Sequence, residues 1–211
     1  GNHRFERVVF RGNTYGVSSD YWDRGPGTGF TRCTFDGNAN AVYWGGTPNY
    51  PVVLNQSVVY QTGGFVLEGL AVVSNTIFHL SGAGSRIYGS TGVTSDYNDL
   101  FVTNGAVVHP DHADLAAWAT ETRDPHSLSA DPLFADPANH DFHLKGRGGR
   151  WTTAGWVKDR ESSPCIDAGD PALPYGLEPL PNGKRINMGL FGNTIHASRA
   201  KNFAGTLLLI N

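Results

Sequence analysis

The stretch Phe30-Thr31-Arg32-Cys33-Thr34-Phe35 decides the fold, because variants of it recur through the first half of the chain. Each variant is six residues long and closes on an aromatic residue, with small or polar turn residues after it. The closing aromatics are 25, 25, 18 and 23 residues apart, which is a repeat period and not a domain period. The five phrases are Phe5–Phe10, Phe30–Phe35, Asn55–Tyr60, Val73–Phe78 and Asp96–Phe101.

The phrases predict short β-strands. They are rich in Val, Thr, Phe and Tyr, which pack well on a pleated surface, and Gly and Asn bound them. A unit of roughly 18 to 25 residues cannot bury its own apolar face, so successive units must stack and share a core. In the third phrase a register shifted by one residue, with Leu54, Ser57 and Val59, fits about as well, so that alignment stays open.

Among repeat architectures, a β-helix fits this spacing best. The Leu-x-x-Leu-x-Leu pattern of leucine-rich repeats is absent, and a propeller needs about 40 residues per blade. We therefore predict an all-β solenoid with coils over residues 1–108. A short helix and irregular final coils, or a cap, should follow over residues 109–198. Residues 199–211 are predicted to be a tail or the start of a following segment.

One helix is expected within Asp111–Thr122. Asp111 or Asp114 is placed to cap its start, and Leu115 and Trp118 share one face at an i, i+3 spacing. We expect this helix to pack against or cover the coil stack.

Composition limits the classes of partner. Charged residues make up 17% of the chain and the net charge is -3, without the clusters of Lys and Arg that nucleic-acid binding requires. No apolar run approaches the roughly 18 residues of a transmembrane helix, and no signal peptide is recognisable.

Because the sequence begins inside a repeat and ends on an apolar run, we expect a portion of a longer chain.

The two cysteines leave two interpretations open. Cys33 stands at a phrase position that should face the core, and Cys165 lies far away in a Ser-Pro-Cys-Ile segment. A disulfide is one interpretation. Two separately buried thiols that act as small apolar residues fit these contexts better.

A series of short motifs marks the C-terminal region. They are Asp124-Pro125-His126-Ser127-Leu128, Asp131-Pro132-Leu133-Phe134, Asp141-Phe142-His143-Leu144, Ser163-Pro164-Cys165-Ile166-Asp167-Ala168-Gly169 and Asn187-Met188-Gly189-Leu190-Phe191-Gly192-Asn193-Thr194. In this order they resemble the C-terminal region of bacterial right-handed parallel β-helix repeat proteins of the pectate-lyase-like superfamily. The resemblance implies a secreted or cell-surface β-helix attached to a larger protein, with no agreed catalytic set. Asp before Pro is also ordinary turn chemistry, so we favour a structural role for these motifs.

Insertions between the phrases carry the candidate binding residues. Aromatic faces stack on sugar rings, which points to Tyr21, Trp22, Tyr43 and Trp44 as substrate-binding residues. Beside the first pair, Asp20 and Asp23 could serve as the acid and base of a glycosidase, with Arg24 binding hydroxyls or a uronate carboxylate. A solvated loop with packed aromatics is the alternative.

Acidic residues suggest a cation site. Asp96 and Asp99 lie on the last recognisable strand and could ligate calcium, which prefers hard oxygen ligands. Alternation along that strand places Asp99 on the opposite face from Asp96 and Asn98, and a stacked Asn75–Asn98 ladder explains the segment equally well. His109, Asp111, His112 and Asp114 form a weaker metal candidate whose other interpretation is a helix cap.

Three functions remain open. The first is a non-catalytic structural or polysaccharide-recognising segment. The second is a polysaccharide lyase or glycosidase acting on an acidic polysaccharide, with Arg24 or Arg86 as a candidate base that neighbouring coils would have to align with Asp96 or Asp99. The third is self-association into a filament or surface assembly through the coil ends.

Overall fold

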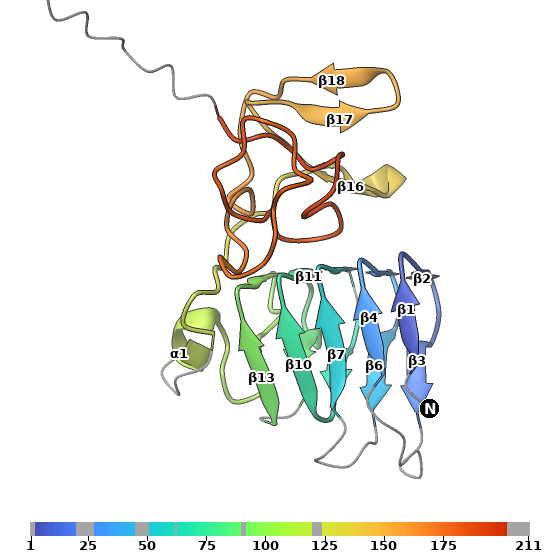
Figure 1. Ribbon diagram of the computed structural model, residues 1–211. Coiled ribbons are helices and arrows are strands. Elements are labelled where there is room, and N and C mark those ends of the chain that lie inside the picture. The colour runs from blue at the N-terminus through green and yellow to red at the C-terminus, as the bar shows by residue number, and fades with distance from the viewer. Residues whose placement is uncertain are drawn as a thin grey trace, which may run out of the picture.

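The computed structural model describes residues 3–19, 28–44, 51–61, 63–89, 92–119 and 124–201 (Figure 1). Three parallel sheets stack coil upon coil into a β-solenoid, as the repeat predicts. Sheet A contains β1 (Arg4–Glu6), β4 (Gly29–Thr31), β7 (Val52–Asn55), β10 (Ala71–Ser74) and β13 (Val93–Asp96). Sheet B contains β2 (Val9–Arg11), β5 (Thr34–Asp36), β8 (Val58–Tyr60), β11 (Ile77–Ser81) and β14 (Asp99–Thr103). Sheet C contains β3 (Tyr15–Ser19), β6 (Asn40–Trp44), β9 (Phe65–Glu68) and β12 (Arg86–Tyr88).

Each six-residue phrase forms a corner between two strands, so the prediction of one strand per phrase is wrong. The phrase starts at the middle or end of a sheet A strand and finishes in sheet B. Between them, one residue per coil takes the left-handed conformation, with φ of 47° to 58°. We call these the corner residues: Arg7, Arg32, Gln56, Asn75 and Tyr97. The left-handed backbone turns the chain sharply enough to leave one sheet and join the next.

Strand pairing settles the open register. Leu54 aligns with Phe30 and Val59 with Phe35, so the shifted alignment of the third phrase is the right one. In the fifth phrase Leu100 aligns with Phe78. Tyr60 and Phe101, which were expected to close phrases in the core, therefore lie one residue further on, partly exposed on the outer face of sheet B.

The core fills the inside of the coils with one large side chain above another. Phe35 and Phe78 are fully buried, and Phe10 stacks on Phe35 with ring centroids 4.9 Å apart. Phe5 and Phe30 stack in the same way at 5.1 Å. Because identical positions of neighbouring coils lie in register, every coil buries its apolar residues against the next.

A ladder of side-chain acceptors runs up the corner beside the left-handed residues. The backbone N–H of Cys33 donates to Ser57 Oγ at 3.1 Å, that of Ser57 to Thr76 Oγ1 at 3.4 Å, and that of Thr76 to Asn98 Oδ1 at 2.9 Å. The N–H of Asn98 donates to Ser127 Oγ at 2.8 Å. The expected Asn75–Asn98 ladder is wrong, because Asn98 aligns with Thr76 and not with Asn75. At the corner the chain turns from one sheet to the next, and these bonds give the buried backbone N–H groups there a hydrogen-bond acceptor.

The helix α1 (Leu115–Ala119) packs at the end of the coil stack, as expected, and is shorter than the predicted segment (Figure 1). Asp114 caps it by accepting the Ala117 N–H at 2.9 Å. Trp118 is fully buried, and its ring lies over Tyr88 with centroids 5.0 Å apart. The indole N–H donates to the buried Asp124 carboxylate at 2.6 Å, so the helix covers the last coil through one side chain.

Residues 130–201, which we call the C-terminal layer, lie along the outer face of sheet B and do not continue the coils (Figure 1). Of the two forms expected for residues 109–198, irregular final coils or a cap, the strands of this layer have that of a cap, because they pair in separate antiparallel hairpins. β15 (Phe134–Asp136) and β16 (Asp141–Leu144) form an antiparallel hairpin joined by the 3-10 turn η1 (Pro137–Asn139). A second antiparallel hairpin pairs β17 (Arg150–Thr152) with β18 (Gly155–Val157).

A second apolar core joins the layer to sheet B. Val58 and Ile77 project outward from the sheet and pack with buried residues of the layer. Those residues are Phe134, Phe142, Leu144, Cys165 and Met188. The layer thereby removes Val58 and Ile77 on the outer face of sheet B from solvent, whereas Val9 on the same face stays exposed.

The corner residues also hold the layer through polar contacts. Gly192 O accepts from Arg32 Nη2 at 3.1 Å and from Gln56 Nε2 at 3.0 Å. Asn75 Oδ1 accepts the Asp170 N–H at 2.7 Å, and its backbone oxygen accepts the Gly189 N–H at 2.8 Å. The glycine-containing C-terminal motifs are therefore the segments that dock on the corner, in line with their expected structural role.

Both cysteines are buried free thiols, which confirms the second interpretation of the pair. Within the described residues, no helix has the length and apolar character needed to cross a membrane.

Replacing Phe78 with Ala should lower the free energy of unfolding by about 3 to 5 kcal/mol, because it removes a fully buried aromatic from the centre of the stack. Urea denaturation would measure this. Val72→Ala, at an exposed position of sheet A, is the control and should change stability by less than about 0.5 kcal/mol. Equal midpoints for Phe78→Ala and the unmodified chain would contradict the inward assignment.

Gly189→Ala should destabilise the docked layer. The backbone φ of Gly189 is +81°, and an added Cβ would meet Ile77 Cδ1 at 2.9 Å. We expect a loss of about 1 to 3 kcal/mol, measured by thermal unfolding. Gly176→Ala is the matched control, since a Cβ there meets nothing within 4 Å. A Gly189 variant as stable as the Gly176 variant would rule out this tight contact.

Candidate functional site

Three aromatic rings gather on sheet C, and we call them the aromatic cluster: Tyr15, Tyr43 and Phe65. Their centroids are 6.2 to 6.3 Å apart, and no two rings are parallel. Tyr15 is 44% exposed and Tyr43 is 40% exposed. Each ring comes from a different coil, on β3, β6 and β9, so the stacking of the coils creates the cluster.

A charged pair borders the aromatic cluster. Arg86 on β12 lies over the Phe65 ring at 5.5 Å and forms an ion pair with Glu68 at 3.5 Å. Arg86 and Phe65 are paired residues of neighbouring strands. Aromatic faces bind the C–H faces of sugar rings, while a guanidinium and a carboxylate donate to and accept from hydroxyls. This surface therefore offers both kinds of contact that a saccharide needs.

The structure places the predicted binding residues differently. Tyr43 is exposed in the aromatic cluster, whereas Trp44, 5% exposed, is part of the core. Other predicted residues lie outside the described part of the chain: Asp20, Tyr21, Trp22, Asp23 and Arg24.

Sequence reasoning missed Tyr15, Phe65 and Glu68 as members of this surface. Tyr15 and Phe65 each begin a sheet C strand shortly after the turn that closes a phrase. That recurring position after the turn is the signal that could have found them, once the coil register was known.

The remaining acid and base candidates lie on different faces. Arg86 is on sheet C, Asp96 ends a strand of sheet A, and Asp99 begins a strand of sheet B. Asp96 contacts His126, with Nδ1 2.8 Å from Oδ2, and accepts the His126 N–H at 2.8 Å. Among the described residues, the stack does not bring these groups into one groove.

Asp99 is buried beneath the C-terminal layer. Its Oδ2 accepts from Cys165 Sγ at 3.1 Å and its Oδ1 from the Ala130 N–H at 3.1 Å. Burial raises the pKa of Asp99 to about 7, against the opposing effect of these two hydrogen bonds. Burial, followed by the charge of Asp99, raises the pKa of the Cys165 thiol well above its usual value. The pair acts as a polar contact that joins sheet B to the layer.

The metal candidates do not assemble within the part of the chain that the structure describes. No group of three or more His, Cys, Asp or Glu side chains there is arranged to hold a metal ion. His109 and His112, with their Nδ1 atoms 3.4 Å apart, pack around Trp118 at the base of α1. Their contacts fit the helix-cap interpretation.

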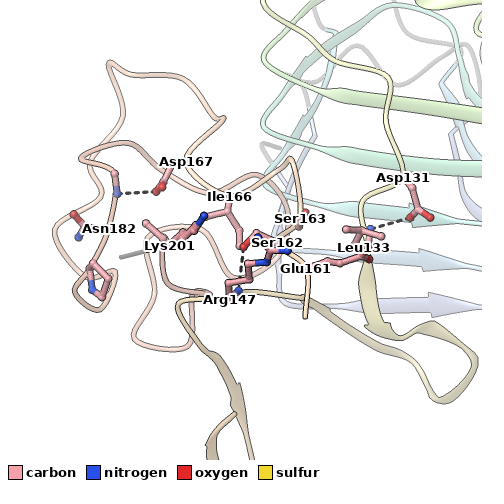
Figure 2. A pocket seen from close by; sticks show the side chains of 13 residues that line it. Asp131, Leu133, Arg147, Glu161, Ser162, Ser163, Ile166, Asp167, Asn182 and Lys201 are labelled. Atoms are coloured by element: carbon pink, nitrogen blue, oxygen red, sulfur yellow. Dashed lines mark hydrogen bonds between the residues drawn. The ribbon is translucent and has the colours of Figure 1, made fainter. Parts of the chain in front are cut away.

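The C-terminal layer contains an open cleft of about 870 Å³ (Figure 2). Asp131 and Leu133 line the side near the coils, and Asp167 and Asn182 line the far side. Glu161 stands beside Arg147, whose Nε donates to Arg160 O at 2.6 Å. Both acidic and basic side chains line this cleft, so it has no clear preference for a charged ligand.

A profile of the disaggregatase-related family matches residues 33–169, about two thirds of the chain. The chain belongs to the disaggregatase-related family. No curated protein and no solved structure matched it.

The matched segment of this disaggregatase-related chain begins in the corner of the second coil and ends at Gly169, where the layer docks on Asn75. It therefore includes coils, helix and part of the C-terminal layer. Membership of the disaggregatase-related family agrees with a parallel β-helix. The affiliation with the pectate-lyase-like superfamily stays a prediction.

Asp99→Asn should remove part of the pH dependence of stability. The pKa of Asp99 is higher in the folded protein than in the unfolded chain, so folding takes up a proton there between about pH 4 and about pH 7, and stability falls as pH rises through that range. The asparagine variant should gain stability relative to the unmodified chain over that range, by up to about 4 kcal/mol.

Urea midpoints at pH 4, 5.5, 7 and 8 would measure this difference. Glu178, also buried with a pKa raised to about 7, contributes the same trend in both proteins and cancels in the comparison. Parallel pH curves for the two proteins would contradict the raised pKa of Asp99.

Proposed function

We propose that this chain is a polysaccharide-recognition module that binds its ligand along the outer face of sheet C. The observation that carries the proposal is the exposure of Tyr15 and Tyr43 beside the Arg86–Glu68 pair. Extended sugar chains suit solenoids, because stacked coils repeat a binding position along one face.

The arrangement of the rings supports recognition over packing alone. The rings that stabilise the stack, such as Phe35 and Phe78, are fully buried inside the coils. Tyr15 and Tyr43 instead lie on the outside, and nearly half of each residue faces solvent. Exposed aromatics grouped on one face are characteristic of binding surfaces.

A lyase or glycosidase on an acidic polysaccharide has less support from the described residues. Such an enzyme needs its acid, base and charge-neutralising groups around one sugar ring. Arg86, Asp96 and Asp99 belong to three different sheets, and Asp99 is buried under the C-terminal layer. We therefore favour binding without turnover.

A polysaccharide ligand also bears on where the chain works. We propose a location outside the cell or at its surface, as part of a larger protein, because that is where structural polysaccharides are met. The rigid stack would then hold the aromatic cluster at a fixed orientation relative to neighbouring domains.

Tyr43→Ala should reduce polysaccharide binding by roughly five- to 100-fold, since one aromatic–sugar contact is lost, with little change in melting temperature. Affinity electrophoresis in gels containing acidic and neutral polysaccharides would measure retardation. Tyr175→Ala, a partly exposed tyrosine of the C-terminal layer, is the control and should migrate as the unmodified chain.

The same polysaccharides should be assayed for unsaturated or reducing-end products. Binding without product supports the recognition proposal. Equal retardation of the Tyr43 and Tyr175 variants would contradict the recognition proposal. Product formation that persists in Tyr43→Ala would contradict it as well.

A further inference from the structure

The strands of sheet C carry two charged residues, and these two are neighbours. Glu68 ends β9 and Arg86 begins β12, with Arg86 Nη2 3.5 Å from Glu68 Oε2. The other residues of β3, β6, β9 and β12 are uncharged, and the structure describes all four strands in full. These strands are therefore neutral as a whole, because their one cation is matched by their one anion.

Packing holds the Glu68 carboxylate beside Arg86. A Cβ added at Gly89 would overlap Glu68 Oε2 and lie 2.7 Å from Glu68 Cδ, so the carboxylate rests directly on the glycine backbone. The Gly89 N–H donates to Leu67 O at 2.8 Å, which ties that backbone to β9. The oxygen that lies against Gly89 is also the one that contacts Arg86. Glu68 thus occupies one side of the guanidinium.

The inner part of the Arg86 side chain is already engaged. Its guanidinium carbon lies over the Phe65 ring, and its Nε is buried with no hydrogen-bond partner among the described residues. The terminal nitrogens are therefore the donors that remain for a ligand. The Arg86 and Glu68 side chains are 33% and 32% exposed, so a ligand on the outer face of sheet C can reach both.

This pair distinguishes neutral sugars from acidic ones. A sugar hydroxyl both donates and accepts, so neighbouring hydroxyls can accept from Arg86 and donate to Glu68 at the same time. A sugar carboxylate only accepts, and to reach Arg86 it must stand beside the Glu68 carboxylate, where like charges repel. Salt screens partly buried charges less than exposed ones, so the repulsion persists at physiological ionic strength.

We propose that Glu68 makes the surface of sheet C selective for neutral polysaccharides, because it holds the place beside Arg86 that an acidic sugar would need. This inference rests on the proposed function, since it concerns the charge of the ligand that the same surface binds. The aromatic cluster supplies the stacking contact, Arg86 donates to hydroxyls, and Glu68 determines the specificity.

Pairs of polysaccharides that share a backbone and differ in charge test the proposal: hydroxyethyl cellulose with carboxymethyl cellulose, and dextran with carboxymethyl dextran. Interferometry with the whole chain and the immobilised polymers gives a ratio of neutral to acidic affinity for each pair. We expect the neutral member of every pair that binds to bind at least about tenfold more tightly. A preference below about threefold, or a reversed one, would overturn this inference and leave the recognition proposal standing. Absence of binding to all four polymers would overturn both.

Glu68→Gln is the decisive variant, because it removes the charge and keeps the size of the side chain. The ratio of neutral to acidic affinity should fall at least about tenfold, since Arg86 becomes available to a carboxylate, and the gain in acidic binding should weaken as salt rises. Adding Arg86→Gln to this variant should abolish the gain.

Glu161→Gln is the matched control. It makes the same change in net charge at an exposed residue of the C-terminal layer, and it should keep the affinity ratio of the unmodified chain. An unchanged ratio in Glu68→Gln, or an equal change in Glu161→Gln, would overturn the role of Glu68.

Discussion

The left-handed corner between sheets A and B is the constraint on which the rest of this structure depends. A single residue with φ near +50° turns each coil, and the next residue supplies the N–H that bonds to a side chain of the following coil, from Cys33 to Ser127. Non-glycine residues rarely take this conformation, so it persists only where neighbouring contacts hold it. Here the acceptor ladder and the docked C-terminal layer both do so.

The corner also decides which surfaces remain open to ligands. Its outward side chains bind the C-terminal layer, and the layer covers much of sheet B and buries Asp99 with it. On sheet C, none of the described segments covers Tyr15 and Tyr43 in this way, so the aromatic cluster faces solvent. The proposed binding surface on sheet C is therefore one that the docking of this segment leaves exposed.

Much of the fold follows from the spacing of the phrases, because stacked coils impose a period that the sequence must repeat. The β-solenoid, the helix at Leu115–Ala119 and the separate burial of Cys33 and Cys165 were all predictable. The candidate site was less so. Tyr43 could be named from its insertion, but Tyr15 and Phe65 join it only through strand pairing across coils.

The sequence by itself determined the architecture. An apolar residue that recurs in every coil is buried against the equivalent residue of the next coil, so the repeat alone specifies the stack. The tertiary structure alone decided the register of the third and fifth phrases, because a shift of one residue exchanges inside for outside, as it does for Tyr60 and Phe101. It also decided where the C-terminal layer docks. That contact joins residues such as Gln56 and Gly192, which are far apart in the chain and follow no shared period.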